Sequence, residues 1–137
     1  MLLENKTAVV YGGGGSVGGA VARAFARERA HVFLTGRTSA ALDAMAEDIS
    51  DAGGRAETAS LNALDEDAVD RHADAVAENT DGIDVSFDAI GHGDVVHGTP
   101  LLDMPYEVFA GSITTAIRAQ FLTARAAARH MVRRGAG

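Results

Sequence analysis

Six of the eight residues from Gly12 to Gly19 are glycine, and they separate the apolar residues 7–11 from an alanine-rich segment with helical periodicity. Glycine loses more backbone entropy on folding than any other residue. Such a cluster therefore suits places where the backbone needs a positive φ or must approach another group closely. When a strand is followed by such a turn and then by a helix, the first N–H groups of the helix have no hydrogen-bond partner and carry partial positive charge. A glycine turn leaves these groups accessible to a phosphate. The segment predicts a phosphate-binding turn, with a purely structural turn as the alternative.

Apolar runs and helical patterns alternate along the rest of the chain. Residues 7–11 and 31–35 are short apolar runs, typical of parallel strands buried on both faces. The βαβαβαβα order predicts an α/β fold, with a doubly wound parallel sheet, right-handed crossovers and helices on both faces. The remaining strands are expected at residues 56–61 and 83–91, and the helices at residues 16–30, 39–54, 65–80 and 105–134.

Three of the predicted helices have patterns that indicate their ends or buried faces. Ser39 is a favoured N-cap residue for the second helix, and Gly53 with Gly54 is a typical stop. The third helix carries acidic residues in its first turn, where the helix dipole favours them. The first helix is amphipathic, and its apolar stripe consists of Val17, Val21, Phe25 and Ala26.

The composition limits the class of protein. A chain of 137 residues has the length of one domain, and we expect residues 1–137 to form a single domain. The absence of cysteine excludes disulfides and thiolate metal sites and favours a reducing compartment. Residues 1–13 lack the features of a signal peptide, and no apolar run is long enough to cross a membrane. We therefore expect a cytoplasmic protein without a membrane partner.

The formal net charge is −7, with most carboxylates in residues 41–88 and arginines concentrated near the end of the chain. An acidic balance argues against a nucleic-acid partner, because phosphate binding needs a clustered basic surface. The terminal arginines are interpreted as the solvated flank of the last helix. They are Arg118, Arg125, Arg129, Arg133 and Arg134.

The glycine segment resembles the first loop of the short-chain dehydrogenase/reductase family, which reads Thr-Gly-x-x-x-Gly-x-Gly. Gly12 and Gly18 match the outer glycines of that loop, while Tyr11 replaces the threonine and Ser16 the middle glycine. Residues 60–69 are similar to the family's Asp-Val segment, residues 83–91 to its Asn-Asn-Ala-Gly strand end, and residues 121–132 to its following long helix. The resemblance covers essentially the whole chain but only the N-terminal half of the family. It implies that residues 1–137 form a dinucleotide-binding domain that is incomplete at its C-terminus.

This resemblance implies a Rossmann-like sheet with strand order 3-2-1-4 and a nicotinamide dinucleotide as cofactor. Gly12 is expected to form the tight turn, and Gly18 to let the helix approach the phosphate and the sheet. The residues expected to bind the cofactor are Gly12, Gly14, Gly15, Ser16, Val17, Gly18, Arg37, Thr38, Asn62, Ala63, Asp88, Ala89, Ile90 and Gly91.

The choice between NAD(H) and NADP(H) depends on the end of the second strand. An NAD enzyme has an Asp or Glu there to hold the ribose 2′-hydroxyl, whereas a 2′-phosphate is repelled by a carboxylate and attracted by arginine. This chain has Gly36, Arg37 and Thr38 at that point, which favours NADP(H) over NAD(H). The alternative is that Arg37 is a solvated loop residue.

The family's catalytic residues are not found in this chain. The chemistry needs a serine and a Tyr-x-x-x-Lys pair, in which the lysine lowers the pKa of the proton-transferring tyrosine. The one lysine is Lys6, and the tyrosines are Tyr11 and Tyr106. The asparagine that completes the family's proton relay is expected at Ala116. We therefore expect cofactor binding without turnover, because the catalytic segment would begin shortly after Gly137.

Two histidines provide the remaining candidate chemistry. His92 and His97 lie in the loop after the fourth predicted strand, with Asp94 and Asp103 as the carboxylates that could add a third metal ligand. Because so few metal ligands are available, we expect no metal here, and we interpret this segment as a loop that lines the cofactor or the substrate.

The last helix is expected to form a homo-oligomer contact. In the family it helps to build a subunit interface, and here the fourth strand would be an open sheet edge. The apolar stripe of this helix consists of Phe109, Ile113, Ile117, Phe121, Ala124, Ala128 and Met131.

Two hypotheses for the function remain open. The first is an NADP(H)-dependent oxidoreductase that reduces a carbonyl or oxidises an alcohol of a small molecule, with this chain as its cofactor-binding half. The second is a non-catalytic NADP(H)-binding sensor or regulatory module. A structural fragment without a ligand is the weakest alternative, because it gives the glycine loop and Arg37 no role.

Overall fold

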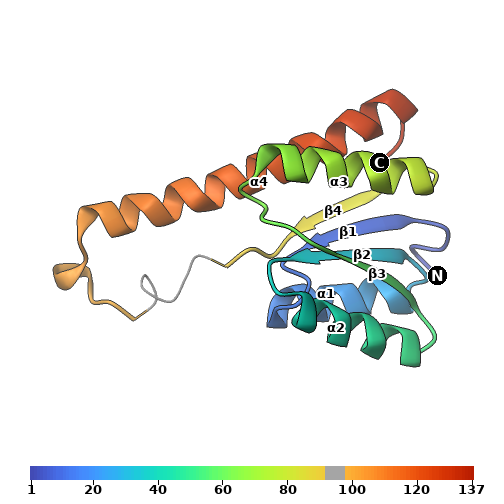
Figure 1. Cartoon of the computed structure of the whole chain (residues 1–137), viewed down its shortest axis with the longest axis horizontal. Coiled ribbons are helices and arrows are strands. Elements are labelled where there is room, and N and C mark those ends of the chain that lie inside the picture. The colour runs from blue at the N-terminus through green and yellow to red at the C-terminus, as the bar shows by residue number, and fades with distance from the viewer. Residues whose placement is uncertain (92–97) are drawn as a thin grey trace.

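The computed structural model of the chain describes residues 1–91 and 98–137. Strands and helices alternate up to β4, and one long helix ends the chain (Figure 1). In chain order the elements are β1 (Thr7–Tyr11), α1 (Ser16–Arg27), β2 (His31–Gly36), α2 (Ser39–Asp51), β3 (Arg55–Ser60), α3 (Glu66–Asn79), β4 (Val85–Asp88), the short 3-10 helix η1 (Leu101–Asp103) and α4 (Tyr106–Arg134). Every strand and helix expected from the sequence is present, while η1 was not predicted.

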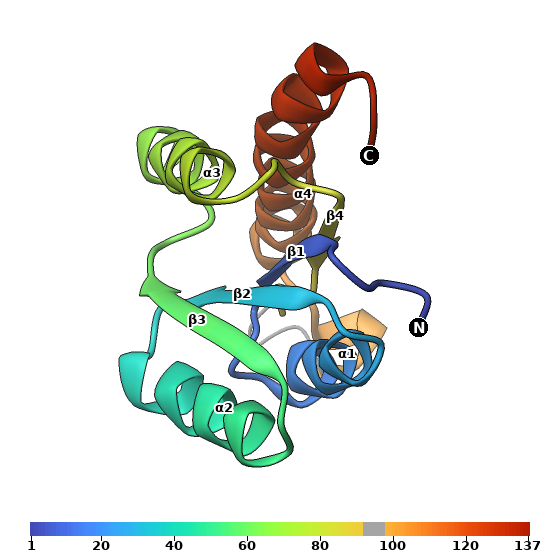
Figure 2. The same ribbon diagram turned by 90° about the vertical axis from the view of Figure 1, so that its right-hand side faces the viewer.

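The four strands form one parallel sheet with the order β3-β2-β1-β4, which confirms the predicted topology. Helices α1 and α2 cover one face of the sheet, and α3 and α4 lie on the other (Figure 2). Tyr11 is in register with Thr35 on one side and with Asp88 on the other. Because all strands run in the same direction, the loops that follow them meet at a single edge of the sheet.

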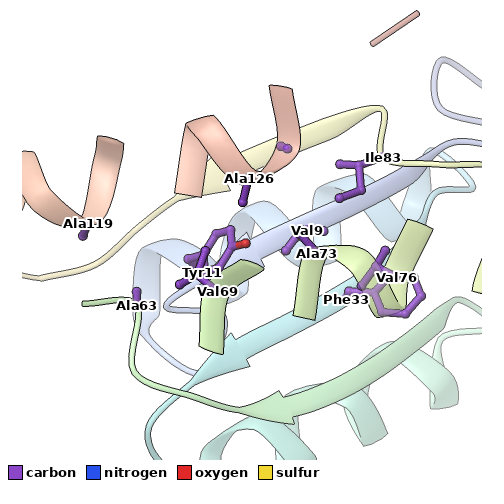
Figure 3. Packing of buried hydrophobic residues seen from close by; sticks show 11 residues of the cluster. Val9, Tyr11, Phe33, Ala63, Val69, Ala73, Val76, Ile83, Ala119 and Ala126 are labelled. Carbon is purple, nitrogen blue, oxygen red and sulfur yellow. The ribbon is translucent and has the colours of Figure 1, made fainter. Parts of the chain in front are cut away.

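Alternate residues of β1 and β2 enter two separate hydrophobic clusters. Val9, Tyr11 and Phe33 pack toward α3 and α4, whereas Val10 and Leu34 pack toward α1 and α2. Figure 3 shows Tyr11 in the first cluster, with Val69 of α3 and Ala126 of α4 close by. The alanines of α3 and α4 leave room for this large ring. Because protein interiors are close-packed, this arrangement accounts for part of the high alanine content.

Four details of the predicted helices and strands are wrong. Val17 is 62% exposed, and the buried residues of α1 are Gly18, Gly19 and Ala22. The small residues form the inner face because α1 lies too close to the sheet for a larger side chain there. Thr38 is the N-cap residue of α2 and makes no side-chain cap bond, so Ser39 is already helical. The third strand starts one residue earlier, at Arg55, and the fourth is shorter than predicted, at Val85–Asp88.

Most of the arginines of α4 bond to neighbouring elements and are not simply solvated, while Arg133 is exposed as predicted. Arg125 pairs with Glu66 of α3, and Arg129 Nη1 lies 3.1 Å from Asp70 Oδ2. His130 Nε2 lies 2.8 Å from Asp74 Oδ1, one turn further along α3, so that the three pairs form a ladder between the two helices. Individually, such partly exposed pairs contribute little, about 0–1 kcal/mol each. Together they fix the rotation of α4 relative to α3.

Arg134 fastens the end of α4 to the start of β4. Its guanidinium donates to the Asp81 carbonyl at 2.6 Å, the Ile83 carbonyl at 3.2 Å and Asp84 Oδ1 at 2.7 Å. Asp84 also accepts from the backbone N–H of Thr7 at 2.9 Å, which ties in β1. Burial alone would raise the pKa of the Asp84 carboxyl, but the donors from Thr7, Arg134 and Lys6 outweigh it and hold that pKa below its usual value.

The N-terminal half of α4 extends past the carboxyl edge of the sheet (Figure 1). Phe109, Ile113, Ile117 and Phe121 are exposed along this half. None of the helices within residues 1–91 and 98–137 is long and apolar enough to cross a membrane.

The Arg134 contacts predict a measurable loss of stability. Arg134→Ala removes the cationic donor of the Asp81 and Ile83 carbonyls and one of the two cations that contact the nearly buried Asp84 carboxylate, which should lower the free energy of unfolding by about 1–3 kcal/mol. The matched control is Arg133→Ala, an exposed neighbour for which about 0.5 kcal/mol or less is expected. Urea unfolding followed by circular dichroism measures both. Equal losses in the two variants would contradict this role for Arg134.

Candidate functional site

A cleft of about 600 Å³ lies at the carboxyl edge of the sheet, where the loops after all four strands converge. This is within the range of about 300–1,000 Å³ that small-molecule and cofactor sites occupy. It is the place where open α/β sheets bind their ligands. The sequence predicted a site at this edge, and most of the residues chosen from the sequence line it. Those residues are Gly12, Gly14, Gly15, Arg37, Thr38, Asn62, Ala63, Ala89, Ile90 and Gly91.

The glycine turn owes its shape to two close backbone contacts. Gly12 has a φ of +75°, and a Cβ atom there would lie 2.7 Å from the Ala89 carbonyl oxygen. A Cβ atom on Gly18 would lie 2.1 Å from the Gly12 carbonyl oxygen. Both distances are far below van der Waals contact, and both neighbouring atoms belong to the backbone. No other residue type fits at these two positions without moving β1, α1 or the loop after β4.

The N-terminus of α1 is open toward the cleft. Gly15 is its N-cap residue, no side chain caps the helix, and its first turn contains no acidic residue. Gly13 donates its N–H to the Thr35 carbonyl at 3.0 Å, which anchors the turn to β2. Ser16, Val17 and Gly18 form the first turn of the helix behind the cleft and do not line it. The uncapped N–H groups and the helix dipole suit this end for a phosphate.

The loop after β2 brings a cation to one end of the cleft. Arg37 is exposed, lines the cleft and makes no ion pair within residues 1–91 and 98–137. The Ser60 hydroxyl donates to the Arg37 carbonyl at 3.3 Å, so the backbone at this point is held while the side chain stays available. The N-terminus of α2 follows directly and is also uncapped. Positive charge therefore gathers where the sequence predicted a 2′-phosphate.

The loop after β3 forms the wall beside Arg37. Asn62 Oδ1 accepts from the Leu64 N–H at 3.0 Å, and the Asn62 carbonyl accepts from the Asp65 N–H at 3.0 Å. The Asn62 side chain therefore shapes the turn with its oxygen, and its amide nitrogen is the part left for a ligand. Arg118 of α4 donates from Nε to the Leu64 carbonyl at 3.0 Å and holds α4 against this loop.

Asp88 lies apart from the other residues chosen from the sequence. It does not line the cleft but a separate groove between β4 and α4, which Ser86, Gln120 and Thr123 share. Its Oδ1 accepts from the Ile90 N–H at 2.8 Å, so Asp88 shapes the loop that carries Ala89 to Gly91. Burial, followed by the nearby Asp88 carboxylate, raises the pKa of Tyr11 well above its usual value, and the phenol stays neutral.

The sequence interpretation missed several residues of the cleft. Gly36, Leu61 and Leu64 are sequence neighbours of residues that were chosen, and Thr35, Ala41 and Leu42 lie within four residues of Arg37 or Thr38. Thr115 comes from α4, far along the chain, and only the fold brings it to the cleft. The histidine pair with Asp94, at residues 92–97, lies outside the described residues. Within residues 1–91 and 98–137, no three His, Asp or Glu side chains come together in a way that could hold a metal ion.

The short chain dehydrogenase family profile matches residues 6–137. The chain belongs to the short-chain dehydrogenases. L-rhamnose 1-dehydrogenase (NAD(P)(+)) of Azotobacter vinelandii is 32% identical over 143 residues, which covers 100% of this chain and 54% of that protein. Gluconate 5-dehydrogenase of Gluconobacter oxydans is 30% identical over 135 residues, covering 98% of this chain and 52% of that protein. This short-chain dehydrogenase chain thus spans about half the length of these relatives.

Solved structures of short-chain dehydrogenases have the same fold. A metagenomic short-chain oxidoreductase in complex with NADP superposes with a TM-score of 0.83 at 29% identity, covering 100% of this chain and 61% of that one. NAD+-bound xylitol dehydrogenase superposes with a TM-score of 0.89 at 26% identity, covering 100% of this chain and 52% of that one. The family binds nicotinamide dinucleotides, and these two neighbours contain different ones.

The close contact of Gly18 with Gly12 predicts a sharp difference between two glycine substitutions. Gly18→Ala forces its methyl group into the Gly12 carbonyl, so it should lower the free energy of unfolding by about 1–3 kcal/mol. Gly15→Ala is the control, because its Cβ would lie 3.4 Å from the same oxygen, an ordinary contact. Thermal and urea unfolding measure the two effects. A Gly18→Ala variant as stable as Gly15→Ala would show that the turn does not depend on this contact.

Proposed function

We propose that this chain binds NADP(H) and supplies the cofactor-binding part of a short-chain oxidoreductase. The observation that carries the proposal is that one cleft joins an uncapped helix N-terminus behind a glycine turn to the unpaired Arg37 side chain. A dinucleotide with a 2′-phosphate needs both features. Its pyrophosphate requires backbone N–H donors, and its 2′-phosphate requires a planar cation.

We propose one position in the cleft for each part of the cofactor. The pyrophosphate fits Gly14 and Gly15 at the start of α1, and the 2′-phosphate fits Arg37 with Thr38. The adenine then lies along Asn62 and Ala63, and the nicotinamide end extends toward Ala89, Ile90 and Gly91. The absent Cβ atoms of the turn support this fit, because a side chain at Gly12 or Gly18 would collide with the backbone that gives the turn its shape. Ser16, Val17 and Gly18 contribute through the helix start, and Asp88 by shaping its loop.

The activity expected of the whole protein is hydride transfer between NADP(H) and a small molecule that carries a carbonyl or an alcohol. The bound cofactor supplies the hydride or accepts it. We infer that the proton-transferring residues lie outside residues 1–137, because Lys6 is far from the cleft edge and alanine stands at position 116. The relatives are about twice as long, which is consistent with this division.

A non-catalytic NADP(H)-binding module is the second candidate, and Ala116 is the observation that favours it. The family's relay asparagine is expected at that position of α4, so this departure lies inside the part of the family that the chain covers. A downstream segment with serine and Tyr-x-x-x-Lys would favour the oxidoreductase, whereas its absence from the full reading frame would favour the binding module.

Exchanging the charge at Arg37 tests the cofactor preference. We expect the chain to bind NADPH more tightly than NADH, and Arg37→Glu to weaken NADPH binding by about tenfold to a hundredfold, because a charge-assisted hydrogen bond is worth about 1.5–3 kcal/mol. The affinity for NADH should change much less. Cofactor fluorescence titration measures the affinities of the wild type and of Arg37→Glu for NADPH and for NADH. The matched control is Arg27→Glu, at the far end of α1. Equal affinity for both cofactors in the wild type would refute the preference.

We further propose that the chain self-associates through α4. The exposed residues Ile113, Ile117 and Phe121 repeat along one side of the helix, and such an apolar stripe favours contact with a second copy. Ile117→Lys should reduce self-association by at least several-fold, whereas Leu2→Lys, at an exposed apolar residue away from α4, should not. Sedimentation velocity over a range of concentrations measures this. A wild-type chain that stays monomeric at high concentration would rule the contact out.

A further inference from the structure

A second cavity lies at the amino edge of the sheet, opposite the cleft. Helices α1 and α2 run antiparallel to the strands, so both of them end at this edge, onto which Figure 2 looks. Between the two helix ends is a cavity of about 380 Å³, a volume within the range of small-molecule sites. Its lining combines apolar groups, from Ala26, Ile49 and Ala52, with three arginine side chains.

The three arginines differ in how their charge is balanced. Arg23 Nη2 lies 2.8 Å from Asp48 Oδ2, so these two charges neutralise each other. Arg27 and Arg29 are exposed and make no ion pair and no side-chain hydrogen bond within residues 1–91 and 98–137. Three arginines against one aspartate leave the cavity positively charged, although the formal net charge of the chain is −7.

The backbone at the end of α1 has an arginine where glycine is favoured. Arg29 follows the C-cap residue Glu28, has a φ of +72° and donates its N–H to the Ala26 carbonyl at 3.0 Å. Gly53 occupies the matching position after α2, with a φ of +81°. The left-handed conformation is unfavourable for a residue with a Cβ atom, which is why glycine is common just after a helix. Arg29 therefore carries a conformational cost that glycine would avoid, and this supports a role for its side chain.

The two helix ends present few free carbonyl groups that would repel an anion. The carbonyls of their last turns accept hydrogen bonds from the backbone N–H groups that follow. These carbonyls belong to Ala24, Phe25 and Ala26 in α1 and to Asp48, Ile49 and Ser50 in α2. The donors that remain are guanidinium groups, whose planar N–H pairs match a carboxylate or a phosphate.

We propose that this cavity binds a small organic anion, with its carboxylate or phosphate group between Arg27 and Arg29 and its apolar body against Ala26, Ile49 and Ala52. The site is separate from the cofactor cleft, and the proposal does not rest on the proposed function. Because both arginines are exposed, the affinity is expected to be low, with a Kd on the order of 1 mM.

Three small probes separate the two parts of the predicted ligand. Hexanoate has a charged group and an apolar chain, acetate has the charge with almost no chain, and hexanamide has the chain without the charge. Each is titrated into the ¹⁵N-labelled chain, and the backbone amide shifts of Arg29, Gly53 and Gly54 are followed. We expect all three amides to shift with hexanoate, which should bind at least several-fold more tightly than acetate or hexanamide.

Arg29→Gly separates binding from folding. It removes the guanidinium and also relieves the left-handed backbone, so hexanoate affinity should fall by about threefold to tenfold while the thermal unfolding midpoint stays at or above that of the wild type. Arg71→Gln is the matched control, because it removes one exposed charge from α3, on the other face of the sheet. It should leave hexanoate binding unchanged.

The two sites are expected to respond independently. Arg27→Glu should weaken hexanoate binding and leave NADPH binding unchanged, whereas Arg37→Glu should do the reverse. Hexanoate binding that is weakened by Arg37→Glu would place the probe in the cofactor cleft and overturn the proposal.

Several other results would also overturn it. Acetate that binds as tightly as hexanoate would show a charged surface without a cavity site, and hexanamide that binds as tightly would show that the arginines have no part. Absent shifts at the three amides, or an Arg29→Gly variant that binds hexanoate like the wild type, would contradict the site as well.

Discussion

The contact between the Gly18 Cα and the Gly12 carbonyl is the constraint on which the cleft depends. It lets α1 start directly behind β1, with its N–H groups facing the carboxyl edge of the sheet. The same closeness explains why α1 is lined by glycine and alanine on its inner face and leaves Val17 in solvent. One absent side chain thus determines the helix packing and the opening that a phosphate can enter.

The other walls of the cleft are positioned by contacts between elements that are far apart in sequence. Gly13 is hydrogen-bonded to Thr35, which links the turn to β2, and Arg118 is hydrogen-bonded to Leu64, which links α4 to the loop after β3. The acidic side of α3 and the basic side of α4 form a ladder of ion pairs, and Arg134 fixes the far end of α4. The two hydrophobic clusters hold the helices on the sheet. The polar contacts of Arg118, Arg125, Arg129 and Arg134 orient α4 at the site.

The sequence was sufficient for the order of strands and helices along the chain and for the edge at which the site lies, because apolar runs, helical periods and a glycine turn are local signals. The order of the strands within the sheet was predicted from the resemblance to the family. It was not sufficient for contacts that depend on two elements meeting. The arginines of α4 were expected to face solvent because their partners on α3 are about sixty residues away. Thr115 gave no signal because only the packing of α4 in the fold brings it to the cleft. Ser39 was predicted as the N-cap residue because serine is favoured there, but the N-cap residue of α2 is Thr38.

The most direct test of the account is an NMR titration of the uniformly ¹⁵N-labelled chain with NADP+, followed by backbone amide shifts. The account predicts that the largest shifts fall on Gly13 to Val17, with a second group at Arg37 and Thr38 and a third at Asn62 and Ala63. Shifts that are absent, or confined to the groove between β4 and α4, would contradict the claim that this cleft binds a dinucleotide.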